Sequence, residues 1–340
     1  FMAGEKEALF WKVLDKEKKT VQCQLCPHFC VLNVGERGKC HVRENKKGKM
    51  ISLVYGKPCS LALDPIEKKP LYHFLPGKEA LSIATAGCNL RCSNCQNWEI
   101  SQCNPEDIKS LSIKPEEVIK EAKKNKVKII SYTYTEPTIF YEYMLDIAKL
   151  ARKDGIKNTT VTNGFINLEP LTQLCEYLDG SNIDLKSIDD EFYRRNCGTR
   201  IEPVLKAIKI MHEKGVWIEL TNLLIPGLND STEEIEKLVE WIRKNIGKNV
   251  PLHFTAFYPT YKLLNLPPTP LSTLRKARNI ALSKGLNYVY TGNLPDEEGN
   301  NTYCPRCKQL LIRREGYYVA ENKLKRGKCP CGEKIAGVWE

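Results

Sequence analysis

The sequence predicts an α/β fold, a partial (β/α) barrel with a small cysteine-rich unit at each end. Three observations favour it. Strand-like and helix-like stretches alternate from about residue 80 to 293, cysteines cluster before, within and after this region, and unusual polar residues follow the strand-like stretches. We therefore expect an N-terminal cysteine-rich unit over residues 1–75, the partial barrel over 76–295, and a cysteine-bearing tail over 296–340.

The central region justifies the barrel. Its apolar runs are rich in β-formers, helix-period runs separate them, and Pro115, Pro170 and Pro203 stand where first helical turns are expected. Such alternation predicts a parallel sheet with right-handed crossovers. The expected strands cover residues 81–85, 127–134, 158–162, 182–185, 216–224, 250–257 and 287–291, and the expected helices cover 114–124, 139–153, 168–178, 202–214, 231–245 and 271–284. A further short helix is expected over residues 7–14.

The composition is that of an ordinary globular protein. The 340 residues are 42% hydrophobic and 27% charged, and the formal net charge is +11. A diffuse lysine excess usually means a solvated surface, although an anionic partner is the alternative. No apolar run is long enough to cross a bilayer, and no apolar core follows the N-terminus as in a signal peptide. We therefore expect a cytoplasmic protein without a membrane partner.

Fifteen cysteines are present, and eleven of them form three clusters. In a reducing compartment such clusters bind metal more often than they form disulfides. The central cluster, Cys88, Cys92 and Cys95, has the spacing C-x3-C-x2-C directly after an expected strand. Three thiolates can hold a [4Fe–4S] cluster and leave one iron open. The alternative is a zinc site with Cys103 as fourth ligand, but zinc usually takes four ligands in paired knuckles.

This motif resembles the hallmark of the radical S-adenosylmethionine (SAM) superfamily. The resemblance implies that the reduced cluster cleaves SAM to methionine and a 5′-deoxyadenosyl radical, which takes hydrogen from a peptide, protein or small molecule. It also implies an electron donor such as flavodoxin or ferredoxin. Asn94 departs from the superfamily, which usually has an aromatic residue before the third cysteine.

Polar residues after the other strands fit a site at the carboxyl edge of the barrel. Thr135 and Glu136 occupy the place of the superfamily's Gly-Gly-Glu segment, and Asn163, Asp184 and Lys186 resemble positions that contact SAM. A plain turn at Asn163 and a structural ion pair between Asp184 and Lys186 are the alternatives.

The flanking clusters indicate further metal sites. Cys304, Cys307, Cys329 and Cys331 form two knuckles around a β-rich stretch at 310–319, which is typical of a zinc ribbon or a rubredoxin-like site with zinc or one iron. Cys23, Cys26, Cys30 and Cys40 are compatible with a structural zinc or an auxiliary iron–sulfur cluster, and their spacing does not choose between them.

A finer resemblance rests on residues 23–40, 64–74, 95–101, 131–137 and 290–295 together with the tail cysteines. These are similar to pyruvate formate-lyase activating enzyme-like proteins and to the radical SAM member of the AmmeMemoRadiSam system. The resemblance implies a Memo-like and an AMMECR-like protein as partners.

Three other functions remain open: an activating enzyme for a glycyl-radical enzyme, a nucleic-acid-modifying protein, and a non-catalytic iron–sulfur sensor. The tail is basic, but it has only two close aromatic residues to stack on bases, Tyr317 and Tyr318, so nucleic acid is not the expected partner. Cys197 and His253 are weaker candidates for the site, with an uninvolved thiol and a structural histidine as the alternatives.

Overall fold

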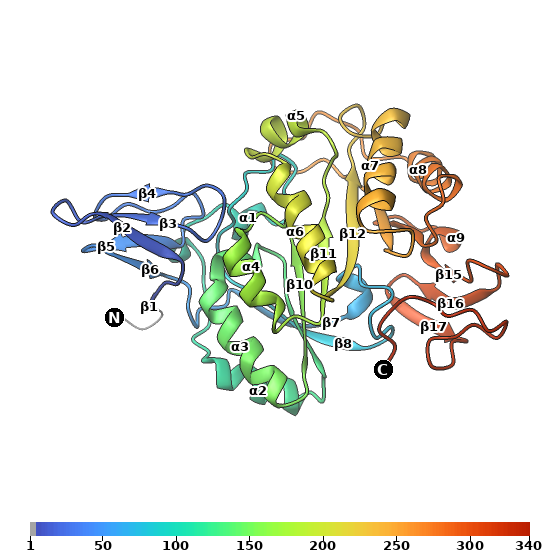
Figure 1. The fold of residues 1–340 in the computed structure, drawn as a ribbon, viewed down its shortest axis with the longest axis horizontal. Coiled ribbons are helices and arrows are strands. Elements are labelled where there is room, and N and C mark those ends of the chain that lie inside the picture. The colour runs from blue at the N-terminus through green and yellow to red at the C-terminus, as the bar shows by residue number, and fades with distance from the viewer. Residues whose placement is uncertain (1–4) are drawn as a thin grey trace.

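An eight-stranded sheet forms the centre of the computed structural model, which describes residues 5–340 (Figure 1). Its strands follow one another across the sheet in chain order, from β7 at one edge to β14 at the other. Neighbouring strands from β8 to β14 are parallel, and β7 pairs antiparallel with β8. The predicted partial barrel is confirmed. The strands are β7 (Ser60–Pro65), β8 (Glu79–Ala84), β9 (Ile129–Tyr132), β10 (Lys157–Thr162), β11 (Gly180–Asp184), β12 (Trp217–Leu224), β13 (Leu252–Ala256) and β14 (Val289–Gly292).

Six helices connect these parallel strands, at the positions that the sequence predicts. Pro115 and Pro203 stand in first turns, where a missing N–H costs no helical hydrogen bond. Gly155, Gly215 and Gly285 follow helix ends with positive φ, a conformation that other residues adopt only with strain. The helices are α2 (Pro115–Lys124), α3 (Tyr141–Lys153), α4 (Leu168–Cys175), α6 (Glu202–Glu213), α7 (Thr232–Asn245) and α8 (Leu271–Ser283).

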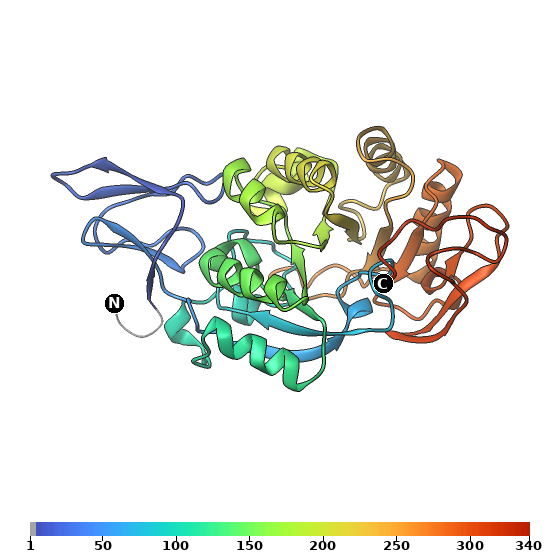
Figure 2. The same ribbon diagram turned by 60° about the horizontal axis from the view of Figure 1, so that its bottom comes forward.

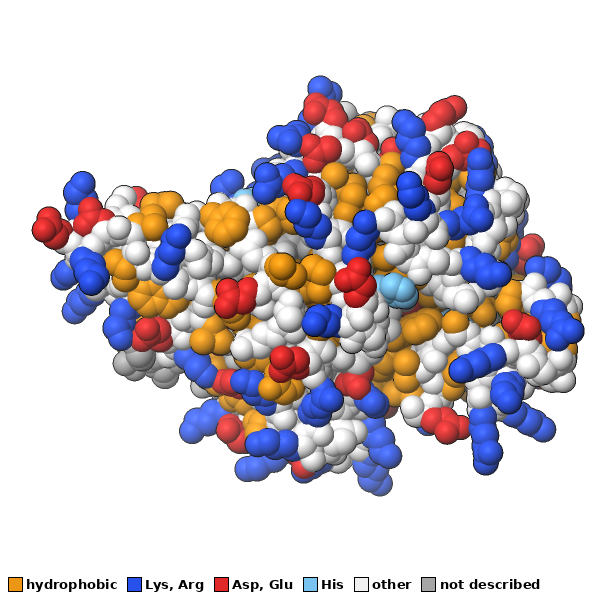
Figure 3. Space-filling view, in the orientation of Figure 1, with side chains coloured by type: hydrophobic (Ala, Val, Ile, Leu, Met, Phe, Trp, Pro, Cys, Tyr) orange, Lys and Arg blue, Asp and Glu red, His pale blue; other side chains and the backbone are white. Residues whose placement is uncertain are grey.

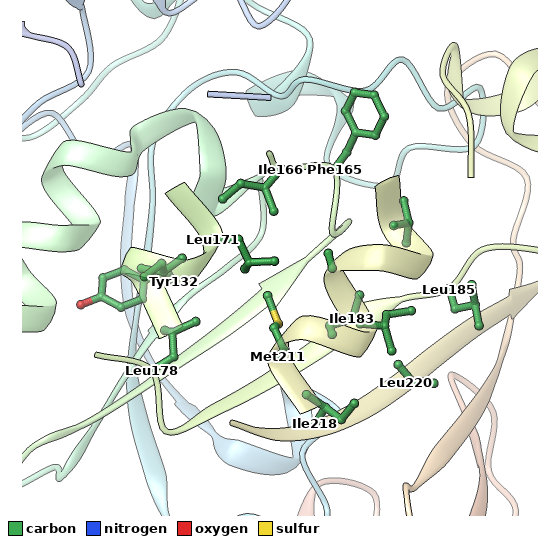
Figure 4. Close-up of a cluster of buried hydrophobic side chains, with 14 of the residues drawn as sticks. Tyr132, Phe165, Ile166, Leu171, Leu178, Ile183, Leu185, Met211, Ile218 and Leu220 are labelled. Carbon is green, nitrogen blue, oxygen red and sulfur yellow. The ribbon is translucent and has the colours of Figure 1, made fainter. Parts of the chain in front are cut away.

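The main core lies between the sheet and these helices. Leu171 from α4 and Met211 from α6 point toward Ile183 of β11, and all three are buried (Figure 4). Truncating such a side chain to alanine typically costs about 2–5 kcal/mol. This packing fixes the sheet, and with it the position of the loops at its carboxyl edge. Short helical elements in the connections between strands are η1 (Ile66–Lys68), α1 (Trp98–Ser101), η2 (Pro105–Asp107), η3 (Pro137–Phe140), α5 (Asp190–Phe192), η4 (Tyr193–Cys197) and α9 (Glu297–Asn300).

The N-terminal unit consists of two small antiparallel sheets and extends from one end of the molecule (Figure 2). The predicted helix over residues 7–14 is wrong, because this segment contains strands. Glu7 pairs with Ile51 and Val13 pairs with Val21, so the backbone hydrogen bonds of this segment join it to neighbouring strands and do not run along a helix. The sheets are β1 (Lys6–Glu7), β6 (Lys49–Ser52) and β5 (Arg43–Lys46), and β2 (Trp11–Asp15), β3 (Thr20–Cys23) and β4 (Val31–Leu32). Residues 1–4, which belong to the segment considered for a signal peptide, lie outside the described residues.

The tail folds as a three-stranded sheet of β15 (Thr302–Tyr303), β16 (Leu310–Glu315) and β17 (Tyr318–Asn322), so the predicted β-rich stretch is confirmed. The tail is joined to the barrel by buried contacts. Arg314 donates a 2.9 Å hydrogen bond to the carbonyl oxygen of Tyr72, and its guanidinium lies 4.1 Å from the centre of the Tyr72 ring. The division at residues 75 and 295 remains a prediction.

Lysine and arginine are interspersed with acidic residues on the face shown in Figure 3, as expected for a solvated surface. No helix within residues 5–340 has the length and apolarity needed to cross a membrane.

Candidate active site and metal centres

Three cysteines lie on the loop that follows β8. Cys88, Cys92 and Cys95 are partly buried. Burial raises the pKa of the Cys88 thiol, and the nearby Glu136, Cys92 and Cys95 add to the increase. The sulfur atoms of Cys88, Cys92 and Cys95 do not all lie within 4.8 Å of one another, since within residues 5–340 only the tail cysteines form such a group. The three sulfur atoms are therefore too far apart to bind a single ion. Such a spread suits a cluster in which each thiolate binds its own iron, and the loop therefore fits a [4Fe–4S] cluster.

Gly87 determines how closely this loop approaches the N-terminal unit. Its φ is +97°, and a Cβ at this position would lie 2.6 Å from both the Cys40 carbonyl oxygen and Val42 Cγ1. Only glycine fits there without a backbone shift.

Hydrogen-bond donors surround the sulfur atoms. The Leu90 N–H lies 3.4 Å from Cys88 Sγ, and Ser101 Oγ lies 3.1 Å from Cys95 Sγ. Asn163 Nδ2 lies 3.8 Å from Cys88 Sγ. Hydrogen bonds from such donors to the sulfur atoms change the reduction potential of a bound iron–sulfur cluster.

Cys197, which sequence reasoning placed only as a weak candidate, lies beside Cys92. Hydrogen bonding to the Cys197 thiol lowers the pKa of Cys92, although burial opposes this, and the charge of Lys186 lowers that pKa further. A lowered pKa favours the thiolate, which is the form that binds iron. The neighbouring Asn196 accepts a backbone hydrogen bond from Ser93 at 2.9 Å and donates one to Asn94 Oδ1 at 3.0 Å. The polar Asn94 thus helps to attach η4 to the cysteine loop.

Glu136 is a buried carboxylate at the end of β9 that connects two loops. Its Oε1 accepts hydrogen bonds from Thr138 N at 3.0 Å, Thr138 Oγ1 at 2.7 Å and Thr162 Oγ1 at 2.7 Å. Its Oε2 accepts from Asn163 N at 2.8 Å. Burial raises the pKa of Glu136, and these donors partly offset the increase. Because both oxygens are occupied by protein donors, the side chain positions the loop after β10.

Thr135 and Asn163 follow β9 and β10, and both contact the end of β8 or the cysteine loop after it. Thr135 Oγ1 donates to the Thr85 carbonyl oxygen at 2.8 Å, which ties the ends of β8 and β9 together. Asn163 Nδ2 donates to Asn89 Oδ1 at 2.9 Å. The Asn163 side chain also accepts a 2.8 Å hydrogen bond from the Phe165 N–H, so it forms a turn and at the same time reaches Asn89 and the sulfur of Cys88.

Asp184 and Lys186 form an ion pair of 2.8 Å at the end of β11. Burial acts to lower the pKa of Lys186, but Asp184, Cys92 and Cys197 outweigh it and raise that pKa well above its usual value. The pair is therefore both an ion pair and part of the cysteine site, and Lys186 supplies positive charge next to Cys92.

The tail cysteines converge on one point. Cys304 Sγ and Cys331 Sγ are 3.7 Å apart, Cys307 Sγ and Cys329 Sγ are 3.6 Å apart, and all four sulfur atoms lie within 4.8 Å of one another. Thiolates bound at about 2.3 Å around one tetrahedral ion stand about 3.8 Å apart. The geometry therefore fits a single ion such as zinc or iron.

The N-terminal cysteines also converge, but less closely. Cys23, Cys26, Cys30 and Cys40 line one enclosed cavity, and they are not among the atoms that lie within 4.8 Å of one another in residues 5–340. His28 and His41 stand beside these cysteines in the chain, and one ring nitrogen of each is engaged elsewhere, at 2.7 Å from the Asn89 carbonyl oxygen and 2.9 Å from Asn104 Oδ1.

His253 lies near the start of β13, away from the carboxyl edge. Its Nε2 is 2.7 Å from Glu219 Oε2, and the same carboxylate accepts the N–H groups of Tyr72 and His73. The structural-histidine alternative is the one that this arrangement favours. Cys175 lies in α4 and is buried.

Comparison with known proteins agrees with this geometry. The sequence model described as the radical SAM superfamily matches residues 82–242. The uncharacterized protein MJ0808 of Methanocaldococcus jannaschii is 47% identical over 97% of this chain and 98% of its own length. The pyruvate formate-lyase-activating enzyme of Clostridium pasteurianum is 27% identical over 53% of this chain and 77% of the enzyme.

A solved structure shows the same fold over most of the chain. A radical SAM methyltransferase from Sphaerobacter thermophilus superposes with a TM-score of 0.52 at 15% identity, and covers 91% of this chain and 81% of the methyltransferase. At this identity the likeness concerns the fold alone. The match over residues 82–242 begins in β8 and contains the cysteine loop, so this region of the chain is the part that matches the radical SAM superfamily.

Proposed function

We propose that this protein is a radical SAM enzyme that binds a [4Fe–4S] cluster through Cys88, Cys92 and Cys95, binds SAM beside it, and abstracts hydrogen from a peptide, protein or small-molecule substrate. When bound and reduced, the cluster supplies the electron that cleaves SAM into methionine and a 5′-deoxyadenosyl group able to take a hydrogen atom. The observation that carries the proposal is the set of spread thiols at the carboxyl edge, surrounded by Asn163 and Lys186.

The protein's own residues would have separate tasks. Glu136 holds the loop after β10 with its four hydrogen bonds, and so orients Asn163. Lys186 offsets the negative charge of the thiolates, since its charge lowers the pKa of Cys92. The carboxylate and amino groups of SAM need polar partners at this edge, and Thr135, Asn163, Asp184 and Lys186 are the groups available to them.

A second function, that of a glycyl-radical-enzyme activating enzyme, is favoured by the relative from Clostridium pasteurianum. The finer likeness to the AmmeMemoRadiSam system gives a third form of the proposal, in which Memo-like and AMMECR-like proteins are the partners and flavodoxin or ferredoxin is the reductant. These three forms share the cleavage of SAM and differ only in the substrate from which the hydrogen atom is taken.

The experiment is anaerobic reconstitution with iron and sulfide, followed by dithionite and SAM and by quantification of 5′-deoxyadenosine by mass spectrometry. Formation of 5′-deoxyadenosine should be abolished when Cys88, Cys92 and Cys95 are replaced together by alanine. The matched control is the Cys59→Ala, Cys103→Ala variant, which removes partly buried thiols outside the three clusters. Equal formation in the parent and the triple variant would overturn the assignment. If formation instead depends on the three cysteines, transfer of deuterium from candidate substrates would distinguish the three forms.

A further inference from the structure

The cavity between the four N-terminal cysteines differs from the tail site in size. Cys23 ends β3, Cys26 and Cys30 lie on the loop that leads to β4, and Cys40 precedes β5. The space that they enclose is about 20 Å³, enough for about one water-sized sphere. Thiolates around a single tetrahedral ion stand about 3.8 Å apart and leave no such space. The tail cysteines have that spacing and the N-terminal cysteines do not.

The backbone around the cavity is shaped to bring the sulfur atoms together. Phe29, directly before Cys30, has φ of 46°, and His41, directly after Cys40, has φ of 67°. Such values cost non-glycine residues about 1 kcal/mol or more and persist where the surrounding structure imposes them. A Cβ at Gly38 would lie 3.6 Å from Cys30 Sγ and 3.7 Å from Cys40 Sγ, so the loop passes close to both sulfurs.

A buried cation faces the sulfur of Cys23. Arg43 is 1% exposed, and its Nη1 lies 3.3 Å from Cys23 Sγ. The same guanidinium pairs with the buried Glu142. A guanidinium is a donor only, so it is matched by a thiolate far better than by a thiol, which is a weak acceptor. Arg43 thus offers a charged donor to the sulfur of Cys23 as well as to Glu142, in a buried position.

The cavity adjoins the central cysteine loop. The carbonyl oxygen of Cys40 packs against Gly87, the residue before Cys88. His28 Nε2 lies 2.7 Å from the carbonyl oxygen of Asn89, and Arg91 donates a hydrogen bond to the carbonyl oxygen of Lys39. The two cysteine loops are thus joined by direct contacts on both sides of Cys88.

We propose that Cys23, Cys26, Cys30 and Cys40 bind a polynuclear iron–sulfur cluster that passes single electrons to the cluster on the central loop. In the transfer the N-terminal cluster is oxidised by one electron and the central cluster is reduced by one. A low-potential donor of the flavodoxin or ferredoxin class, or dithionite in the assay, then reduces the N-terminal cluster again by one electron. The proposal that these four cysteines bind a cluster is argued from the cavity and its contacts. The proposal of electron transfer depends in addition on the proposed function of the central cysteines.

The binding site is tested in the variant with Cys88, Cys92 and Cys95 replaced by alanine, because its N-terminal cysteines are intact. After anaerobic reconstitution, iron, zinc and acid-labile sulfide are counted per chain. The proposal predicts sulfide together with more than one iron, and loss of both when Cys26→Ser and Cys30→Ser are added. A Cys59→Ser, Cys103→Ser pair added instead should leave the counts unchanged. Zinc in place of iron, or iron without sulfide, would overturn the proposal.

A second measurement removes the risk that the added substitutions unfold the unit. The electron paramagnetic resonance spectrum of the reduced central-loop variant should contain an iron–sulfur signal, and its absence in folded, iron-loaded protein would contradict the site. For the transfer, Cys26→Ser and Cys30→Ser in the otherwise intact chain should slow reduction of the central cluster by flavodoxin about ten-fold or more. An unchanged rate would refute the transfer, while failure of SAM cleavage in the parent would refute the proposed function and leave the metal counts valid.

Discussion

Replacing Glu136 by glutamine tests whether this carboxylate positions the site. In the best orientation the amide oxygen keeps the bonds from Thr138 and Thr162, and the amide nitrogen then faces the N–H of Asn163. The lost hydrogen bond to a charged acceptor is worth about 1.5–3 kcal/mol, and a buried donor left unpaired costs about 1–3 kcal/mol. Because a neutral amide is easier to bury than a carboxylate, we expect a net loss of about 2–4 kcal/mol in folding stability.

The loss should appear in two assays. The thermal unfolding midpoint should fall, and because Asn163 is released, SAM should bind at least about ten-fold more weakly by anaerobic calorimetry, which corresponds to about 1.4 kcal/mol. Glu169→Gln, the same change at an exposed position in α4, is the matched control. Unchanged stability and SAM affinity in the Glu136→Gln protein would refute the positioning role.

Three further predictions concern separate parts of the molecule. Serine at Cys307 and Cys331 together should remove one metal ion per chain and expose the tail to limited proteolysis, while the iron of the central loop is retained; an unchanged metal count would contradict a single-ion tail site. Lys186→Met should weaken SAM binding about ten-fold, because the charge beside Cys92 is lost, and Lys284→Met at a partly exposed site is the control; equal affinities of the two variants would exclude this role. His73 donates through Nδ1 to the Ala336 carbonyl oxygen and accepts at Nε2 from Tyr290, so it is held neutral, and burial lowers its pKa from 6.5 to about 4. The unfolded chain therefore takes up this proton first as the pH falls, and stability should decrease between pH 6.5 and 4 by about 3 kcal/mol from this residue. Denaturant titrations over this range should give a shallower pH dependence for His73→Asn, and identical slopes would show that His73 is not the cause.

Much of the fold follows from local patterns. The parallel strands and their helices carry the periodicities, prolines and terminal glycines that propensity and packing both favour, and these agree with the structure. The prediction over residues 7–14 is wrong because this segment lies in strands: Val13 pairs with Val21 in the hairpin of β2 and β3, and Glu7 pairs with Ile51 of β6, far along the chain. Tertiary pairing there overrides the local pattern.

The candidate site, like the fold, is predictable from the sequence where its residues are close together in the chain, and not where distant segments meet. The spacing of Cys88, Cys92 and Cys95 predicts a shared site from the sequence alone, because all three lie on one short loop. The position of Cys197 beside Cys92 depends on how η4 folds back onto that loop, over a separation in sequence of about one hundred residues. Arg43 and Glu142 give no signal in the sequence either, because each is an ordinary surface residue type until burial brings the two together. Contacts of this kind arise only once the chain is packed.

The most direct test of the central claim is hyperfine spectroscopy on the reduced protein with SAM labelled in its amino and carboxylate groups. The account predicts that SAM changes the electron paramagnetic resonance spectrum, and that electron–nuclear double resonance detects coupling to the labelled atoms. Both effects should be absent when Cys88, Cys92 and Cys95 are replaced by alanine. A fully loaded cluster on these cysteines that shows no coupling to bound SAM would contradict the account.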